Sequence, residues 1–162
     1  GARLGADVPA CLHAAPCWVG GIGEEIDAVT DFPHAGIVLA NPRRALSTAA
    51  VFQARRGPFG SAAERFRPTP PDAAALAAAL AGTRNDLTEP AIGLVPEIAG
   101  VLAALARLPG ALVVRMSGSG ATCFALFADR ATAVAPGALL AAAQPSWWCA
   151  AGALVAGAGI SR

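Results

Sequence analysis

Lysine is absent from this chain, and charged residues of any kind are few. All twelve basic residues are arginine, charged residues make up 14% of the sequence, and the net charge is +1. The only basic pairs are Arg43-Arg44 and Arg55-Arg56, and no basic stripe interleaved with aromatic residues surrounds them. Because nucleic-acid affinity depends on neutralising phosphates with clustered positive charge, this composition argues against a nucleic-acid partner.

Long uninterrupted apolar runs are also missing, although hydrophobic residues make up 55% of the chain and mean hydropathy is +0.52. The run 94–116 is broken by residues that include Pro96, Glu97, Arg107 and Pro109, and the run 147–160 is shorter than the roughly 20 residues of a spanning helix. No apolar leader follows Gly1. We therefore expect a folded protein with no transmembrane segment or membrane partner, located in the cytoplasm.

Metal-binding and disulfide patterns are absent as well. The four cysteines show no CxxC spacing and lie in apolar surroundings, and neither His13 nor His34 has a partner at metal-ligand spacing. We expect small buried thiols in a reducing compartment and no metal site, with zinc binding or a disulfide framework as the less favoured alternatives. The chain also lacks an initiator methionine, and its first residues already resemble the middle of a fold, so we expect a piece of a longer protein.

Turn and capping residues divide the rest of the sequence into short elements. The β-branched run 35–41 stops at Pro42, which predicts a buried strand, and Asp72 predicts the start of an alanine-leucine helix ending near Ala81. The other expected elements are a helix start within 4–13, a glycine-broken strand at 16–27, a short helix from Ser47 or Thr48, a helix opened by Asn85-Asp86 with Glu89 as capping-box partner, a helix from Pro96 to about 108, strands at 111–117 and 121–128 around a tight turn at 118–120, a helix at 131–143 and a strand at 147–156.

This order of elements predicts an α+β fold. We expect a ferredoxin-like, four-stranded, mostly antiparallel sheet with helices on one face. Such an architecture says little about function by itself.

Three segments carry a resemblance to a known family. They are LGADVPACLHAAPCWVGGIGE at 4–24, NPRRALSTAAVF at 41–52 and MSGSGATCFALF at 116–127, with NDLTEPA at 85–91 as a weaker fourth. In order and spacing they resemble the carboxyl-terminal half of the GHMP kinases, named for galacto-, homoserine, mevalonate and phosphomevalonate kinases. The branch that they resemble phosphorylates the 2-hydroxyl of a diphosphocytidyl methylerythritol in non-mevalonate isoprenoid biosynthesis.

Asp7 is the candidate catalytic residue. Phosphoryl transfer to an alcohol needs a group that orients the hydroxyl or accepts its proton, and a carboxylate suits that task. An aspartate before an apolar helical stretch is often no more than an N-cap. The resemblance implies that Asp7 is the base or orienting carboxylate.

Thr48 and Phe52 form the candidate substrate site. By spacing alone, Phe52 lies one turn after Thr48 on an amphipathic helix and could be a core residue. The resemblance implies instead that its ring stacks on the cytosine, and base–aromatic stacking contributes about 1–3 kcal/mol. The family commonly has proline where this chain has Ala49.

Gly118, Ser119 and Gly120 form the third candidate element. Two glycines in a turn allow backbone N–H groups to converge as an anion-binding nest, although the same letters often mark a simple hairpin turn. The resemblance implies an active-site scaffold that contacts phosphate through its backbone. Roles for Ser117 and Thr122 are left unassigned.

The resemblance also implies parts that this sequence lacks. Its lysine partner for Asp7 and its glycine- and serine-rich ATP loop are absent, and the glycines at 20–23 are followed by Glu24 and Glu25, which would repel a triphosphate; we expect a bent strand there. The implied cofactors are ATP and Mg²⁺, and the implied partners are the cytidine diphosphate-linked substrate and a missing amino-terminal domain. Residues 1–30 would end that ATP-binding domain and residues 31–162 would form the carboxyl-terminal domain, in a chain inactive alone. The alternatives are another GHMP kinase and a non-catalytic α+β binding module.

Overall fold

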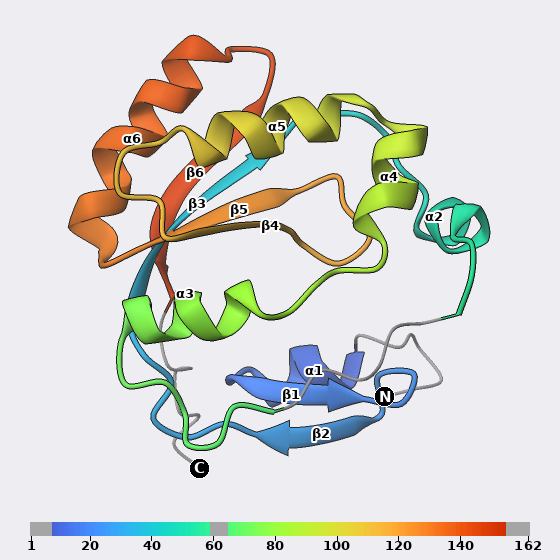
Figure 1. Cartoon of the computed structure of the whole chain (residues 1–162), viewed down its shortest axis with the longest axis vertical. Coiled ribbons are helices and arrows are strands. Elements are labelled where there is room, and N and C mark those ends of the chain that lie inside the picture. The colour runs from blue at the N-terminus through green and yellow to red at the C-terminus, as the bar shows by residue number, and fades with distance from the viewer. Residues whose placement is uncertain (1–7, 59–64, 155–162) are drawn as a thin grey trace.

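The computed structural model describes residues 8–58 and 65–154, which form two sheets and six helices (Figure 1). In chain order the elements are α1 (Val8–His13), β1 (Cys17–Gly20), β2 (Glu25–Ala28), β3 (Ala35–Asn41), α2 (Thr48–Ala54), α3 (Ala73–Ala81), α4 (Thr88–Leu94), α5 (Glu97–Ala106), β4 (Val113–Met116), β5 (Cys123–Phe127), α6 (Arg130–Ala143) and β6 (Trp148–Leu154). No helix in the described part of the chain is both long enough and apolar enough to cross a bilayer.

The larger sheet has the strand order β4-β5-β3-β6, and every pairing in it is antiparallel. β3 is central, so Ala40 pairs with Cys123 of β5 on one side and with Cys149 of β6 on the other. The predicted four-stranded antiparallel sheet and α+β class are confirmed.

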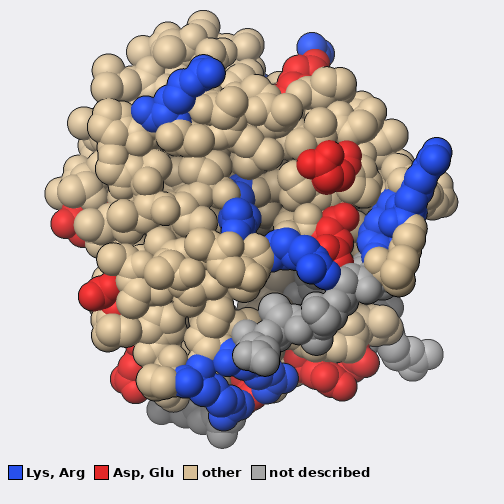
Figure 2. All heavy atoms as spheres, viewed as in Figure 1, with Lys and Arg blue, Asp and Glu red and all other residues tan. Residues whose placement is uncertain are grey.

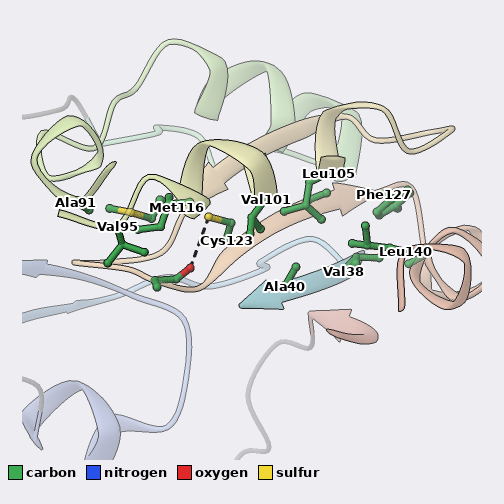
Figure 3. Close-up of a cluster of buried hydrophobic side chains, with 14 of the residues drawn as sticks. Val38, Ala40, Ala91, Val95, Val101, Leu105, Met116, Cys123, Phe127 and Leu140 are labelled. Atoms are coloured by element: carbon green, nitrogen blue, oxygen red, sulfur yellow. Dashed lines mark hydrogen bonds between the residues drawn. The ribbon is translucent and has the colours of Figure 1, made fainter. Parts of the chain in front are cut away.

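Helices α5 and α6 cover one face of this sheet. Alternate residues of the strands point toward them, and Val38, Cys123 and Phe127 are fully buried beneath the helices. Figure 3 shows Val101 and Leu105 of α5 directed at the strand that carries Cys123 and Phe127. This cluster is the main core, because burying large apolar side chains contributes about 1.5–3 kcal/mol each.

Helix α3 lies on the opposite face, across β4 and β5. Its buried residues Leu76 and Ala77 pack against Val113 and Leu126, which alternate with the strand residues of the main core. We expected helices on one face; α5 and α6 take that position, while the apolar stripe of α3 requires a partner of its own and finds it on the second face.

The predicted bent strand at 16–27 is instead a hairpin of β1 and β2. Gly21 and Gly23 have φ angles of +64° and +115°, and the Gly23 N–H donates to the Gly20 carbonyl over 3.0 Å. Positive φ angles at these two glycines form a tight turn that reverses the chain direction, whereas a bent strand would continue in the same direction. The side chain of Glu24 closes the turn by accepting from the N–H of Ile22.

The hairpin is attached to the rest of the molecule through the segment 65–70. Trp18 meets Phe66 edge to face with ring centroids 5.1 Å apart, and Asp27 pairs with Arg65 and, at 3.4 Å, with Arg67. The Thr69 hydroxyl donates to the carbonyl of Thr30 over 3.2 Å. In the described residues the hairpin forms its own sheet; the domain boundary after residue 30 stays a prediction.

Side-chain caps mark the helices whose starts the sequence predicted well. Ser47 caps α2 and Asp72 caps α3 through the Ala75 N–H at 2.8 Å. The capping box expected for α4 is wrong: Leu87 occupies the cap position, and its apolar side chain cannot accept a hydrogen bond.

Candidate active-site turn and its neighbours

Residues 117–122 form the predicted tight turn between β4 and β5. The Ser117 N–H donates to the Thr122 carbonyl and the Gly120 N–H donates to the Ser117 carbonyl, each over 2.9 Å. Gly118 and Gly120 have φ angles of +53° and +89°, so both use the left-handed region that glycine enters without penalty. A turn of this shape can direct backbone N–H groups to one side.

The two glycines have different surroundings. A Cβ added at Gly120 would lie 2.9 Å from Met116 Sδ and 3.3 Å from Leu46 Cδ2, whereas one at Gly118 would meet nothing within 4 Å. Gly120 is therefore needed for close packing as well as for backbone shape, and Gly118 faces open space.

Thr48 contacts this turn directly. Thr48 Oγ1 and Ser119 Oγ lie 2.9 Å apart in a hydrogen bond in which either hydroxyl can donate. Thr48 is the first residue of α2, and the Ser47 cap that starts the helix fixes its direction. Two candidate segments 71 residues apart thus meet at one point.

Phe52 lies one turn after Thr48 and is 49% exposed. The alternative that Phe52 is a core residue does not hold, because its neighbour Val51 is fully buried and provides the core contact of α2. An exposed aromatic ring on the helix that touches the turn remains available for stacking. Its contact with cytosine stays a prediction.

Two asparagines that the sequence analysis did not assign to the site also bind the turn. Asn85 donates through Nδ2 to the carbonyls of Met116 and Gly118, at 3.1 and 2.8 Å. Asn41 donates through Nδ2 to Thr122 Oγ1 at 2.9 Å. The polar residues of the NDL segment were a signal, but helix capping explained them equally well.

Asp7, the candidate catalytic residue, lies outside the described residues, which begin with α1. Of the predicted site residues, the structure therefore brings together Thr48, Gly118, Ser119 and Gly120, with Phe52 one turn away.

A large cavity lies between the hairpin and the α3-bearing face of the sheet. Its volume is about 890 Å³, and its lining is mostly apolar, with Trp18, Phe66 and Phe124 among the contributors. Arg84 and Ser117 also line it, so the cavity reaches the strand end where the turn begins. A second hollow of about 540 Å³ lies between α2 and α4 and includes Arg55, Arg56 and Glu89.

Charge is distributed unevenly over the surface (Figure 2). Charged side chains gather over the lower and right parts of this face, around the hairpin, α2 and α4, and are sparse over α5 and α6.

Hydrogen bonds from a backbone N–H and from Arg44, 2.7 Å away, hold the pKa of Glu97 below its usual value. Within residues 8–58 and 65–154, no group of three or more His, Cys, Asp or Glu side chains could hold a metal ion.

Two of the four thiols lie in or against the main core. Burial raises the pKa of Cys123 to about 12 and also raises the pKa of Cys149. Cys123 and Cys149 face the main core, whereas Cys11 is exposed, so the expectation of buried thiols holds for part of the set.

Comparisons with known proteins show which proteins this chain is similar to. Residues 62–135 match the family described as GHMP kinases C terminal. A 4-diphosphocytidyl-2-C-methyl-D-erythritol kinase of Paramagnetospirillum magneticum is 51% identical over 91% of this chain and 51% of its own length. The corresponding kinase of Rhodospirillum rubrum is 49% identical over 95% of this chain and 50% of its own length.

Solved structures show the same relationship. A crystal structure of a 4-(cytidine 5'-diphospho)-2C-methyl-D-erythritol kinase superposes with a TM-score of 0.71 at 31% identity, covering 98% of this chain and 56% of that one. A homoserine kinase from Cytophaga hutchinsonii, at 16% identity and a TM-score of 0.64, shares the fold. The chain spans about half the length of the curated relatives that it matches. Residues 62–135 are thus similar to the carboxyl-terminal domain of GHMP kinases, and most of the chain is similar to about half of a 4-diphosphocytidyl-2-C-methyl-D-erythritol kinase.

Proposed function

We propose that this chain supplies the carboxyl-terminal half of a kinase that transfers a phosphoryl group from ATP to the 2-hydroxyl of 4-diphosphocytidyl-2-C-methyl-D-erythritol. The observation that carries the proposal is the 2.9 Å hydrogen bond between Thr48 and Ser119. It joins the segment proposed to bind the cytidylate to the turn proposed to bind phosphate. Sequence identities of 51% and 49% to kinases of that name support the choice of substrate.

Phe52 would bind the base. The ring is half exposed and projects from α2 one turn beyond the Thr48–Ser119 contact. A flat, exposed aromatic face suits a pyrimidine, because stacking depends on ring overlap and needs no hydrogen-bond pattern. Binding the cytosine here would direct the methylerythritol end toward the rest of the site.

The turn would bind part of the phosphate chain. Gly118 and Gly120 allow the left-handed backbone from which N–H groups converge on an anion. The chain contains no lysine, so any positive charge that it contributes beside the phosphates would come from arginine. ATP supplies the phosphoryl group, and Mg²⁺ beside it would be held through the phosphates and through groups beyond this chain.

Asp7 would orient the substrate hydroxyl or accept its proton. Transfer to an alcohol leaves the protein mainly with positioning and proton removal, and a carboxylate within hydrogen-bond distance provides both. This role rests on the GADVP motif alone.

Homoserine or mevalonate kinase activity is the alternative within the family, and a non-catalytic binding module is the alternative outside it. The likeness to a homoserine kinase extends to the fold only. The Thr48 and Phe52 pair favours a substrate that carries a flat base.

A chimera tests the proposal. Its amino-terminal half comes from the Paramagnetospirillum magneticum kinase, and this chain replaces the matching carboxyl-terminal portion. We expect ATP-dependent phosphorylation of 4-diphosphocytidyl-2-C-methyl-D-erythritol and no turnover of homoserine. Phe52→Ala should raise the dissociation constant of the cytidylate substrate several-fold, because the stacking of the base is lost, with ATP affinity unchanged.

Asp7→Asn in the same chimera should lower turnover by about 10²–10⁴-fold while leaving the thermal unfolding midpoint unchanged. A folded chimera that turns over homoserine, or neither substrate, would refute the proposed function. Near-normal turnover of Asp7→Asn would remove only the role of Asp7.

A further inference from the structure

Asn85 makes three hydrogen bonds through its side-chain amide. Nδ2 donates to the carbonyls of Met116 and Gly118 at 3.1 and 2.8 Å, and Oδ1 accepts from the Leu87 N–H at 3.0 Å. The two carbonyls are 31 and 33 residues away in sequence, at the end of β4 and within the turn. Asn85 therefore spans two segments that meet only in the folded chain.

Helix capping does not account for this arrangement. Helix α4 begins at Thr88, and Leu87 occupies the cap position without a side-chain hydrogen bond. The donor end of Asn85 points away from that helix, toward the turn. A cap needs an acceptor alone, so the two donated bonds serve another purpose.

Arg115, on the β4 side, donates in turn to backbone carbonyls of the segment that precedes Asn85. Its guanidinium, on β4, donates through Nη2 to the carbonyls of Leu80 and Thr83, each at 2.9 Å. Asn85 thus binds the backbone that follows Arg115, and Arg115 binds the backbone that precedes Asn85. The segment 80–87 and the segment 115–118 are held together from both sides.

These bonds fix the direction of the peptide planes in the turn. In a trans peptide the carbonyl and the next N–H point in opposite directions. Met116 shows this: its carbonyl faces Asn85, and the N–H of Ser117 bonds the Thr122 carbonyl on the other side. By the same geometry, holding the Gly118 carbonyl on Asn85 directs the Ser119 N–H away from Asn85.

We propose that Asn85 is a positioning residue for the phosphate-binding turn. It holds the Met116 and Gly118 carbonyls on its own side, so that the Ser119 N–H is presented on the opposite side. Asn85 acts through the turn, because its donated hydrogen bonds go to the turn and to the end of β4. The inference rests on the proposed function for its catalytic consequence but on the structure for the positioning itself.

Asn85→Asp separates the two roles of this side chain. Aspartate keeps the oxygen that accepts from Leu87 and is as good a helix-start residue as asparagine, but it replaces the donor with an acceptor that faces two carbonyls. Asn41→Asp is the matched control, because the same change there meets the Thr122 hydroxyl, which can rotate and donate.

Amide hydrogen exchange of the 162-residue chain gives the first measurement. We expect Asn85→Asp and Asn85→Ala to accelerate exchange in 117–122 by about tenfold or more, since two carbonyls lose their donor, while α4 stays protected in the Asp variant. Asn41→Asp should leave the turn protected. Unchanged exchange in the turn with Asn85→Asp, or faster exchange in α4 alone, would overturn the proposal.

Kinetics of the chimera give the second measurement. Asn85→Asp should lower kcat by about 10- to 100-fold and change the KM for the cytidylate substrate by less than about threefold, because the substitution leaves the ring of Phe52 in place to bind the base. A rise in that KM with kcat unchanged would overturn the assignment to the phosphate side. If the unsubstituted chimera is inactive, the proposed function fails, and hydrogen exchange still decides the role of Asn85.

Discussion

At the scale of single residues, the stability cost of alanine can be compared at the two glycines of the turn, Gly118 and Gly120. Gly118→Ala adds a methyl group in open space, so its cost is that of a left-handed backbone for alanine, about 1 kcal/mol. Gly120→Ala adds the same backbone cost and a contact of 2.9 Å with Met116 Sδ, which overpacks the site. We expect Gly120→Ala to lower the free energy of unfolding by about 3 kcal/mol.

Denaturant unfolding followed by circular dichroism measures both variants against the unsubstituted chain. The difference between them isolates the packing contribution, because the φ angles of both glycines are positive. Equal losses would mean that Met116 and Leu46 move aside without cost and that the turn is not closely packed.

At the scale of elements, two helical glycines should respond in opposite directions to alanine. Gly100 in α5 has nothing within 4 Å of an added Cβ, so Gly100→Ala should gain about 0.5–1 kcal/mol of helix propensity. Gly137 in α6 lies against the sheet, where a Cβ would come within 2.9 Å of Ala151 and 3.3 Å of Val38. Overpacking of about 1–3 kcal/mol should exceed the propensity gain there.

Thermal unfolding midpoints check this pair. We expect the midpoint to rise for Gly100→Ala and to fall for Gly137→Ala. A rise for both would show that α6 can move away from β3 and β6 without loss.

The start of α6 should carry a pH dependence of its own. Asp129 accepts from the Thr132 N–H at 2.8 Å, and this backbone hydrogen bond is the main reason that its pKa lies below the ordinary 3.8. Because the folded pKa is lowered, the stabilisation is complete above about pH 4 and disappears as the pH falls through the lowered value. Asp129→Asn keeps a capping acceptor but does not titrate.

The measurement is the difference in unfolding midpoint between the unsubstituted chain and Asp129→Asn from pH 7 to pH 2. The difference should be constant down to about pH 4. Below that pH the unfolding midpoint of the unsubstituted chain should fall relative to that of Asp129→Asn. A difference that stays constant across the whole range would show that the cap does not depend on the charge.

Elements with local boundary signals were predicted closely from sequence. The run 35–41 coincides with β3, and Asp72 caps α3 as its position before the alanine tract predicts. The hairpin was missed because one pair of glycines can either bend a strand or reverse it, and the sequence does not distinguish these outcomes. Asn85 was assigned to a cap because the two carbonyls to which it donates are more than 30 residues away in sequence.

The candidate site was predictable only through motifs. Nothing in composition or periodicity indicates that Thr48 meets Ser119, since the contact depends on β3 pairing with β5 and on the direction of α2 after Ser47. The resemblance to GHMP kinases named both segments. The structure adds the distance between them and the exposure of Phe52 that spacing alone left open.

At the scale of the whole molecule, the hairpin and the larger sheet differ in how firmly they are held. The hairpin is joined to residues 65–70 by exposed ion pairs and one aromatic contact, and ion pairs of this kind contribute about 0–1 kcal/mol each. A cavity of about 890 Å³ lies beside it, so its inner side lacks the close packing of the main core. The hairpin should therefore open locally while the sheet remains folded.

Thiol labelling of single-cysteine variants tests this difference, with alanine at the other three positions. Cys17 on β1 is partly exposed, whereas Cys123 on β5 is fully buried and its pKa of about 12 leaves almost no thiolate. Since the thiolate is the reactive form, Cys123 should react only after global unfolding restores both access and an ordinary pKa. We expect its labelling rate to rise steeply with denaturant and that of Cys17 to be fast and nearly independent of it. If both labelling rates rise with denaturant in parallel, Cys17 becomes reactive through the same global unfolding as Cys123. The hairpin and the sheet would then open as one unit.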